Sequence, residues 1–109
     1  MKKIQYKFNE GELAKELVTY INNTYGGHYS KNNFQSTEFI IDCGHGMGFA
    51  IGNVLKYAQR YGKKDGYNRT DLMKILHYAL IALHVHDLNA MIMDELVTRD
   101  VHDLNEVKK

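Results

Sequence analysis

Apolar side chains recur along most of this chain at the three- and four-residue spacing that is typical of helices. The pattern covers residues 10–25, 37–43, 49–61 and 70–86, and it continues less clearly beyond residue 86. The sequence contains no proline, so glycine must supply the breaks between helices. We therefore predict an all-α fold, a small bundle of four to five helices in a single domain that spans residues 1–109.

The first residues show a different pattern. Ile4, Tyr6 and Phe8 alternate with polar residues, which is the two-residue period of a strand, but the run is brief. We expect a short extended arm at the amino terminus. Asn9 followed by Glu12 resembles a capping box and predicts the start of the first helix at residue 10.

The predicted connections are polar or rich in glycine. Residues 28–35 are predicted to form a loop, after which Ser36 caps a short second helix. The stretch 44–48, with glycine at every second position, is predicted to end that helix. Thr70 is the predicted N-cap of the fourth helix.

The fourth helix has a wide apolar stripe, and the predicted core positions are Leu72, Ile75, Leu76, Ala79, Leu80 and Leu83. Beyond His86 the pattern fits either one long helix or two. A C-terminal helix over about residues 89–106 either completes the core or forms a subunit interface, so a homo-oligomer is one expectation.

Net charge and targeting signals restrict the class of protein. The formal net charge is +1, and the only cysteine is Cys43, which suits a reducing compartment. No apolar segment typical of a signal peptide follows the first lysines, and the longest apolar run, residues 78–83, is too short to cross a bilayer. We expect a cytoplasmic protein without a membrane partner. Direct nucleic-acid binding is disfavoured, because the net charge is low and the basic stretch is short.

The third helix carries a basic face. At about 100° per residue, Asn53, Lys56, Arg60 and Lys64 fall on one side and the apolar residues on the other. Residues 56–69 include five basic residues and one acidic residue, whereas residues 87–109 include six acidic and three basic residues. Lysine and arginine in such a cluster suit phosphoryl groups. The alternative is an ordinary solvated helix face.

The stretch 44–48 precedes this helix and contains Gly46 and Gly48. Backbone amides of a glycine-rich loop at a helix N-terminus can hold an anion. The stretch is not a Walker A motif, because no Lys-Ser/Thr pair follows. The alternative is a helix C-cap at Gly44 followed by a flexible turn.

A metal site built by the protein is not expected. The six histidines and the single cysteine show no HExxH or CxxC spacing. Mg²⁺ that arrives with a nucleotide needs few protein ligands, and Asp42 and Asp71 are candidates for contacting it.

Several of these residues together resemble a known family. The most specific part is Gly52-Asn53-x-x-Lys56-Tyr57-x-x-Arg60-x-Gly62-Lys63-Lys64, within a segment of about residues 28–83. It resembles a family of small phage-encoded domains that includes the phage nucleotide kinase lacking a Walker motif, although many members have no assigned function. The resemblance implies a viral protein in the bacterial cytoplasm that phosphorylates deoxynucleoside monophosphates, such as dGMP or dTMP, with a nucleoside triphosphate and Mg²⁺.

The resemblance also suggests roles for individual residues. Lys56 and Arg60 would hold the phosphates during transfer, as the catalytic pair. On the same resemblance, His28, Tyr29, Asn53 and Lys64 would contact nucleotide. The basic segment and the glycine-rich stretch add Tyr57, Lys63, Gly46 and Gly48 to the expected nucleotide-binding residues, with Tyr29 or Tyr57 stacking on the base.

Two other functions stay open at this point. One is a non-catalytic module that sequesters a nucleotide or inhibits a host protein. The other is an all-helical nucleotide pyrophosphatase, for which Glu38, Asp42 and Asp71 supply acidic residues, although no ExxE-type motif occurs.

Overall fold

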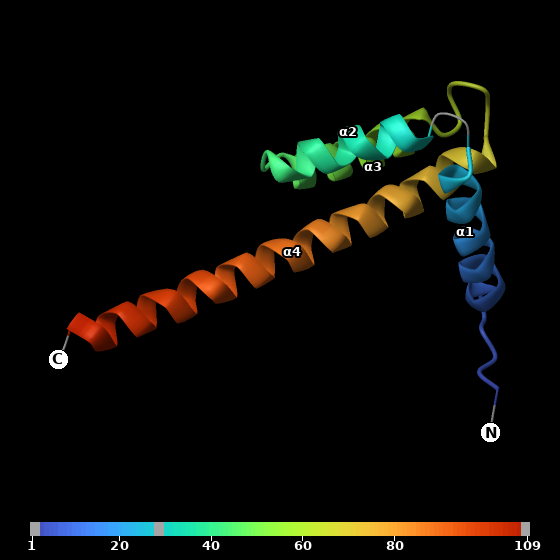
Figure 1. The fold of residues 1–109 in the computed structure, drawn as a ribbon. Coiled ribbons are helices and arrows are strands. Elements are labelled where there is room, and N and C mark those ends of the chain that lie inside the picture. The colour runs from blue at the N-terminus through green and yellow to red at the C-terminus, as the bar shows by residue number, and fades with distance from the viewer. Residues whose placement is uncertain (1–2, 28–29, 108–109) are drawn as a thin grey trace.

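The computed structural model describes residues 3–27 and 30–107, and it describes side chains within 3–27 and 31–98. Four helices follow one another along the chain: α1 (Glu10–Tyr25), α2 (Ser30–Asp42), α3 (Gly46–Arg60) and α4 (Arg69–Val107). The described ranges contain no strand, and the predicted all-α fold is confirmed. Residues 3–8 lead into α1 without regular secondary structure (Figure 1).

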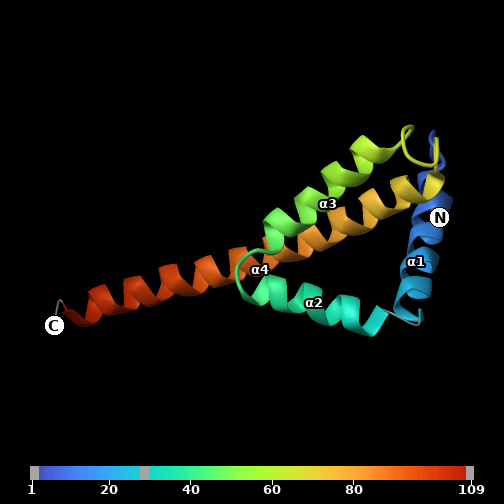
Figure 2. The same ribbon diagram turned by 90° about the horizontal axis from the view of Figure 1, so that it is seen from above.

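The helices form an open, elongated arrangement. α3 packs along the first half of α4, and α1 crosses the amino-terminal end of α4. α2 meets α3 near the turn that joins them and diverges from α4 toward α1 (Figures 1 and 2). The second half of α4 extends well beyond the other helices. The radius of gyration is 19.3 Å, whereas a compact domain of 100 residues has about 13 Å.

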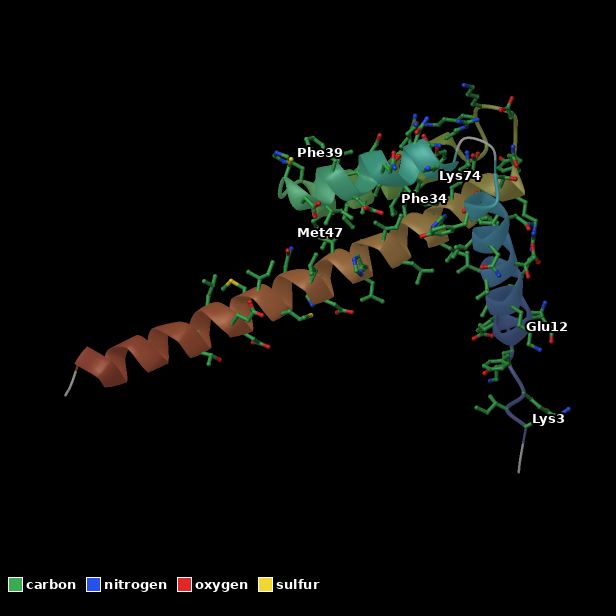
Figure 3. All side chains as sticks on the ribbon, in the orientation of Figure 1. Lys3, Glu12, Phe34, Phe39, Met47 and Lys74 are labelled. Carbon is green, nitrogen blue, oxygen red and sulfur yellow. The ribbon has the colours of Figure 1, made fainter. Side chains whose placement is uncertain are left out.

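The tightest packing joins α3 to α4. The buried apolar side chains are Ala50, Tyr57, Met73, Ala82 and Val85. Two of these five are alanines, so the two helix backbones approach closely at those positions. Little apolar surface is therefore buried within the described part of the chain, and the side chains of residues 91–98 on α4 are exposed (Figure 3).

Most of the predicted core positions of α4 were wrong, although Ile75 is half-buried. The apolar side of α3 opposite its basic residues is also largely exposed. On α4, Leu72, Leu76, Leu80 and Leu83 are 40–57% exposed. On α3, Ile51 and Leu55 are 43% and 63% exposed, while Ala50 and Tyr57 are buried. Each helix has two apolar stripes, and periodicity does not show which one faces the neighbouring helix. The stripe with small and aromatic residues is the one that packs.

The predicted cap of α1 was also wrong, although the helix begins where expected. Asn9 has φ 61°, and its side chain makes no capping hydrogen bond. A capping side chain needs an extended backbone, which this left-handed conformation does not provide. Instead, the backbone N–H of Phe8 donates to the carboxylate of Glu10 at 2.8 Å.

The predicted loop over residues 28–35 is largely helical. Positions 28 and 29 lie outside the described residues, but α2 begins at Ser30, so Ser36 lies inside a helix and caps nothing. The ring of Phe34 stacks on Tyr25 at 4.1 Å between centroids and joins the start of α2 to the end of α1. Phe34 is a single aromatic side chain among polar neighbours, so residues 31–36 show no helical periodicity in the sequence.

Only the first of the three central glycines interrupts a helix. Gly44 has φ +89° in the turn between α2 and α3, whereas Gly46 and Gly48 belong to α3. A Cβ atom at Gly46 would lie 2.9 Å from Ile41 Cγ1 and 3.1 Å from Val85 Cγ2. Gly46 therefore permits the close contact of α3 with its neighbours, and it is not part of a flexible anion loop.

The fourth helix begins earlier than predicted and does not break. The side-chain oxygen of Asn68 accepts a hydrogen bond from the Thr70 N–H at 2.9 Å, so Asn68 and not Thr70 is the N-cap. α4 then continues to Val107 as one helix. Over Arg69–Thr98 its length and composition meet the criteria for a membrane-spanning helix.

Two of the three glycines of α3 provide a direct test of this packing. We predict that Gly46→Ala lowers the free energy of unfolding by about 1–2 kcal/mol, because the new methyl group overlaps Ile41 and Val85. Gly48→Ala is the matched control, because nothing lies within 4 Å of its added Cβ, and we expect it to stabilise the helix by up to about 1 kcal/mol. Urea denaturation measures both. Equal effects at the two positions would contradict the packing role of Gly46.

Candidate functional site: an aromatic cavity beside α3 and α4

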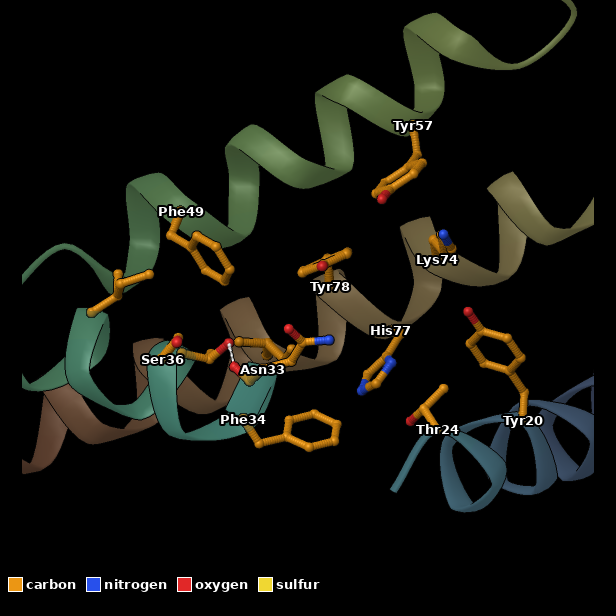
Figure 4. A pocket seen from close by; sticks show the side chains of 13 residues that line it. Tyr20, Thr24, Asn33, Phe34, Ser36, Phe49, Tyr57, Lys74, His77 and Tyr78 are labelled. Carbon is orange, nitrogen blue, oxygen red and sulfur yellow. Dashed lines mark hydrogen bonds between the residues drawn. The ribbon is translucent and has the colours of Figure 1, made fainter. Parts of the chain in front are cut away.

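A cavity of about 440 Å³ lies where the four helices meet. Tyr20 and Thr24 of α1 line one side, and α2 supplies Asn33 and Phe34 among others. The remaining wall comes from α3 and α4. Six of the lining side chains carry rings, and these are Tyr20, Phe34, Phe49, Tyr57, His77 and Tyr78 (Figure 4).

The rings hold one another in place. Tyr57 and Tyr78 lie nearly parallel, with centroids 5.9 Å apart and an interplanar angle of 12°. Phe49 meets Tyr78 edge-on at 5.9 Å, and Tyr20 meets His77 edge-on at 6.3 Å. Contacts of this geometry are favourable beyond simple burial. They fix the faces that a flat ligand would meet.

Among the described residues of the lining, Lys74 is the only one charged at neutral pH. Its Nζ lies 4.9 Å from the centroid of the Tyr57 ring. Two further cations surround the same ring: Lys56 Nζ at 5.1 Å and Arg60 Cζ at 5.9 Å. Tyr57 therefore stands at the centre of a basic cluster, defined here as Lys56, Arg60 and Lys74.

The three cations differ in how they are engaged. Arg60 donates to Asp65 at 3.2 Å, and its Nε lies 3.5 Å from the buried carboxylate of Asp71. Among the described side chains, neither Lys56 nor Lys74 takes part in an ion pair. These two lysines are consequently the cations of the cluster that are open to an anionic ligand.

Burial shifts the protonation of the cavity walls. It lowers the pKa of His77, so its imidazole is neutral at pH 7. Burial, together with the neighbouring Tyr57, raises the pKa of Tyr20 and of Tyr78, so both phenols keep their protons. The cavity thus offers neutral rings and hydroxyl groups beside a positive edge.

The structure brings together some of the predicted site residues and separates others. Lys56, Tyr57 and Arg60 meet in the basic cluster, whereas Lys63 and Lys64 are exposed in the α3–α4 turn. Asn53 is half-buried, and its side-chain amide donates to the Phe49 carbonyl of its own helix at 2.9 Å.

Of the predicted site residues that the structure describes, only Tyr57 lines the cavity. Gly46 is packed between helices, and Gly48 lies in α3 with open space beside it. His28 and Tyr29 lie outside the described residues. Of the acidic candidates, Asp71 is 2% exposed and paired with Arg60, and Asp42 is exposed at the end of α2. In the part of the chain that the structure describes, no three His, Cys, Asp or Glu side chains come together as metal ligands.

Sequence reasoning missed the contribution of α4. Lys74, His77, Tyr78 and Ile81 lie three or four residues apart, so they share one helix face. The leucine stripe on the other side dominated the pattern and was taken as the inward face. A basic and aromatic stripe on an otherwise aliphatic helix was the available signal.

Comparison with known proteins identifies the family but not an activity. The profile of a family of proteins of unknown function, DUF3310, matches residues 21–80. This is more than half of the chain, which therefore belongs to that family. No curated protein and no solved structure matches the chain. The matched range contains most of the residues that line the cavity.

The position of His77 predicts a pH dependence of stability. In the folded state the pKa of His77 is below 6.5, the ordinary value of an exposed histidine. Between these two pKa values the unfolded chain binds more protons than the folded protein. The free energy of unfolding should therefore fall as the pH decreases from neutral through 6.5 and below. We expect His77→Phe to reduce this slope and His86→Gln, an exposed site on the same helix, to preserve it. Denaturant titrations between neutral and mildly acidic pH measure the slope, and identical slopes in all three proteins would contradict the assignment.

The ion pair of Arg60 predicts a structural cost at this position. Arg60→Ala leaves the buried Asp71 carboxylate without its cation, and we expect a loss of about 2–4 kcal/mol in unfolding free energy. Arg69→Ala is the matched control, because Arg69 forms an exposed pair with Glu16 across α4 and α1, and its loss should be much smaller. Thermal and urea unfolding measure both. Adding Asp71→Ala to Arg60→Ala should recover part of the loss, and a purely additive double variant would contradict the coupling.

Proposed function

We propose that this protein is a deoxynucleoside monophosphate kinase whose acceptor binds in the aromatic cavity. The observation that carries the proposal is the basic cluster around Tyr57. Tyr57 and Lys74 both line the cavity of aromatic rings, whereas Lys56 and Arg60 lie beside Tyr57 outside its lining. Nucleobases stack on aromatic side chains, and phosphates bind lysine and arginine. A volume of about 440 Å³ is within the range of small-ligand pockets.

The proposed binding mode follows from the position of the positive charge, which lies beside Tyr57, whereas the other rings of the cavity wall are neutral. The base lies among the rings, where Tyr20 and Tyr78 keep their phenolic protons and can donate hydrogen bonds to it. The phosphate lies against Lys56 and Lys74, the two cations without an ion pair among the described side chains. The resemblance of residues 52–64 to the phage nucleotide kinase supports the same assignment, including action in a bacterial cytoplasm.

The proposed reaction is a direct phosphoryl transfer. An oxygen of the acceptor phosphate attacks the γ-phosphorus of the donor triphosphate, the bond to the bridging β–γ oxygen breaks, and two nucleoside diphosphates result. Lys56 and Arg60 stabilise the charge on the transferring group, and Mg²⁺ accompanies the donor. Arg60 would share its guanidinium between the phosphate and the carboxylates of Asp65 and Asp71, so we assign it a positioning role as well.

Nucleotide binding without catalysis is the second candidate. It is favoured by the composition of the cavity wall, where none of the described lining residues is a carboxylate. A kinase must then hold Mg²⁺ through the phosphates of its substrates, whereas a sequestering protein needs no metal. A pyrophosphatase has less support, because Glu38, Asp42 and Asp71 do not gather into an acidic group in the described part of the chain.

We predict that the protein converts one or two deoxynucleoside monophosphates to diphosphates in the presence of ATP and Mg²⁺. Lys56→Met and Lys74→Met should each lower the rate about 10- to 100-fold, because each removes a cation from the transferring phosphates. Lys15→Met, on the exposed side of α1, is the control and should keep the full rate. Chromatographic separation of the nucleotides measures the products.

Binding measured by calorimetry separates the two candidate functions. Monophosphate binding without product supports sequestration and contradicts the kinase. Absence of binding to all of the monophosphates tested would overturn both. Unchanged turnover in Lys56→Met and Lys74→Met would disprove the proposed site while leaving the activity in place.

A further inference from the structure

The outer face of α4 carries an unbroken heptad spacing. Leu76, Leu80, Leu83, Asp87, Ala90, Asp94 and Val97 follow one another at intervals of four and three residues. Five of the seven positions are apolar and two are aspartates. Apolar residues at this alternation are typical of a helix that packs against another helix along a left-handed coiled-coil seam. We define these seven positions as the α4 seam.

Most of the α4 seam lies away from the packed core, although Leu80 also lines a cavity between α1, α2 and α4. Leu76 is nine residues from the buried Val85, which at about 100° per residue is half a turn of the helix. Leu76, Leu80, Leu83 and Val97 are 45%, 44%, 57% and 57% exposed. Leucines at core positions of a seam are a large apolar surface to leave in water, so the pattern indicates a partner helix.

The small core of the single chain supports the same conclusion. Five apolar side chains are buried in the described part of the molecule, and the chain is much more extended than a compact domain of its length. A chain of this size usually needs more buried surface or association for stability. A heptad stripe is self-complementary, which makes a second copy of the same chain the fitting partner.

We propose that two copies of this protein pair through the α4 seam, with the two α4 helices antiparallel. In a parallel pair, each Asp87 would face Asp87 of the second copy, and each Asp94 would face its own equivalent. An antiparallel pair instead forms layers of Asp87 with Ala90, Asp94 with Leu83, and Leu80 with Val97 of the second copy. Like charges opposite each other are thereby avoided.

The distribution of charge along the chain favours the same orientation. Residues 56–69 have a net charge of +4, from five basic and one acidic residue, and residues 87–109 have −3, from three basic and six acidic residues. Antiparallel pairing brings the acidic end of each α4 toward the basic α3–α4 turn of the second copy. Parallel pairing would bring the two acidic ends together.

A lipid bilayer fits this face less well than a second chain. Although α4 is long and apolar enough to cross a membrane, Asp87 and Asp94 both lie on the seam. Acidic side chains within the apolar part of a bilayer are strongly unfavourable. The first half of the helix is also engaged with α3 and α1.

Light scattering after size-exclusion chromatography tests the pairing directly. We expect the wild-type chain to have twice the monomer mass of 12.6 kDa and to dissociate on dilution. Leu80→Lys and Leu83→Lys should give monomers that keep their helical circular dichroism. Leu55→Lys is the matched control, because it changes an exposed apolar residue of α3 outside the seam, and it should remain a dimer.

Disulfide trapping tests the orientation without relying on destabilised variants. In a Cys43→Ser background, Leu80→Cys and Val97→Cys are prepared as separate proteins. Antiparallel pairing predicts a disulfide between the two proteins when they are mixed, and none in either alone. Disulfides within each separate preparation would show a parallel pair and overturn the proposed orientation.

Two results would overturn the pairing itself. One is a wild-type chain that stays monomeric at every concentration and forms no disulfide in any mixture. The other is a monomer that sediments with phosphatidylcholine vesicles, which would assign the seam to a membrane instead.

Discussion

The structure depends on the close approach of α3 to α4 at two small residues of α3. Gly46 leaves no room for a side chain between Ile41 and Val85, and Ala50 is fully buried. Because the backbones approach at this end, Tyr57 at the other end of α3 reaches the ring of Tyr78 on α4. The same contact therefore forms the core and builds one wall of the cavity.

Arg60 connects this core to the charge of the site. Its pair with the buried Asp71 fixes the end of α3 against the first turn of α4, and its pair with Asp65 fixes the turn between them. These carboxylates partly neutralise Arg60, whereas Lys56 and Lys74 stay available beside Tyr57. Arg60 is therefore engaged in holding the fold together, whereas Lys56 and Lys74 can bind a ligand.

The sequence predicted those features that depend on neighbouring residues. The bounds of α1 and the end of α3 follow from periodicity and from glycine, and both agree with the structure. The start of α2 could not be predicted, because its anchor is a contact between Phe34 and Tyr25 across the intervening turn. Lys56, Tyr57 and Arg60 were recognised from their spacing, but Lys74 and Tyr78 come from another helix. Only the tertiary packing brings Tyr57, Lys74 and Tyr78 to the same cavity.

The error in the faces of α4 has a physical explanation that the proposed dimer would complete. Periodicity identifies apolar positions that need burial, but it does not distinguish burial within a chain from burial between chains. Leu76, Leu80 and Leu83 were predicted as core and are exposed in the single chain. In an antiparallel pair they would be buried after all, against a second α4. The aromatic stripe with Lys74 and Tyr78 lies on another side of the same helix, so pairing would leave the cavity open to its ligand.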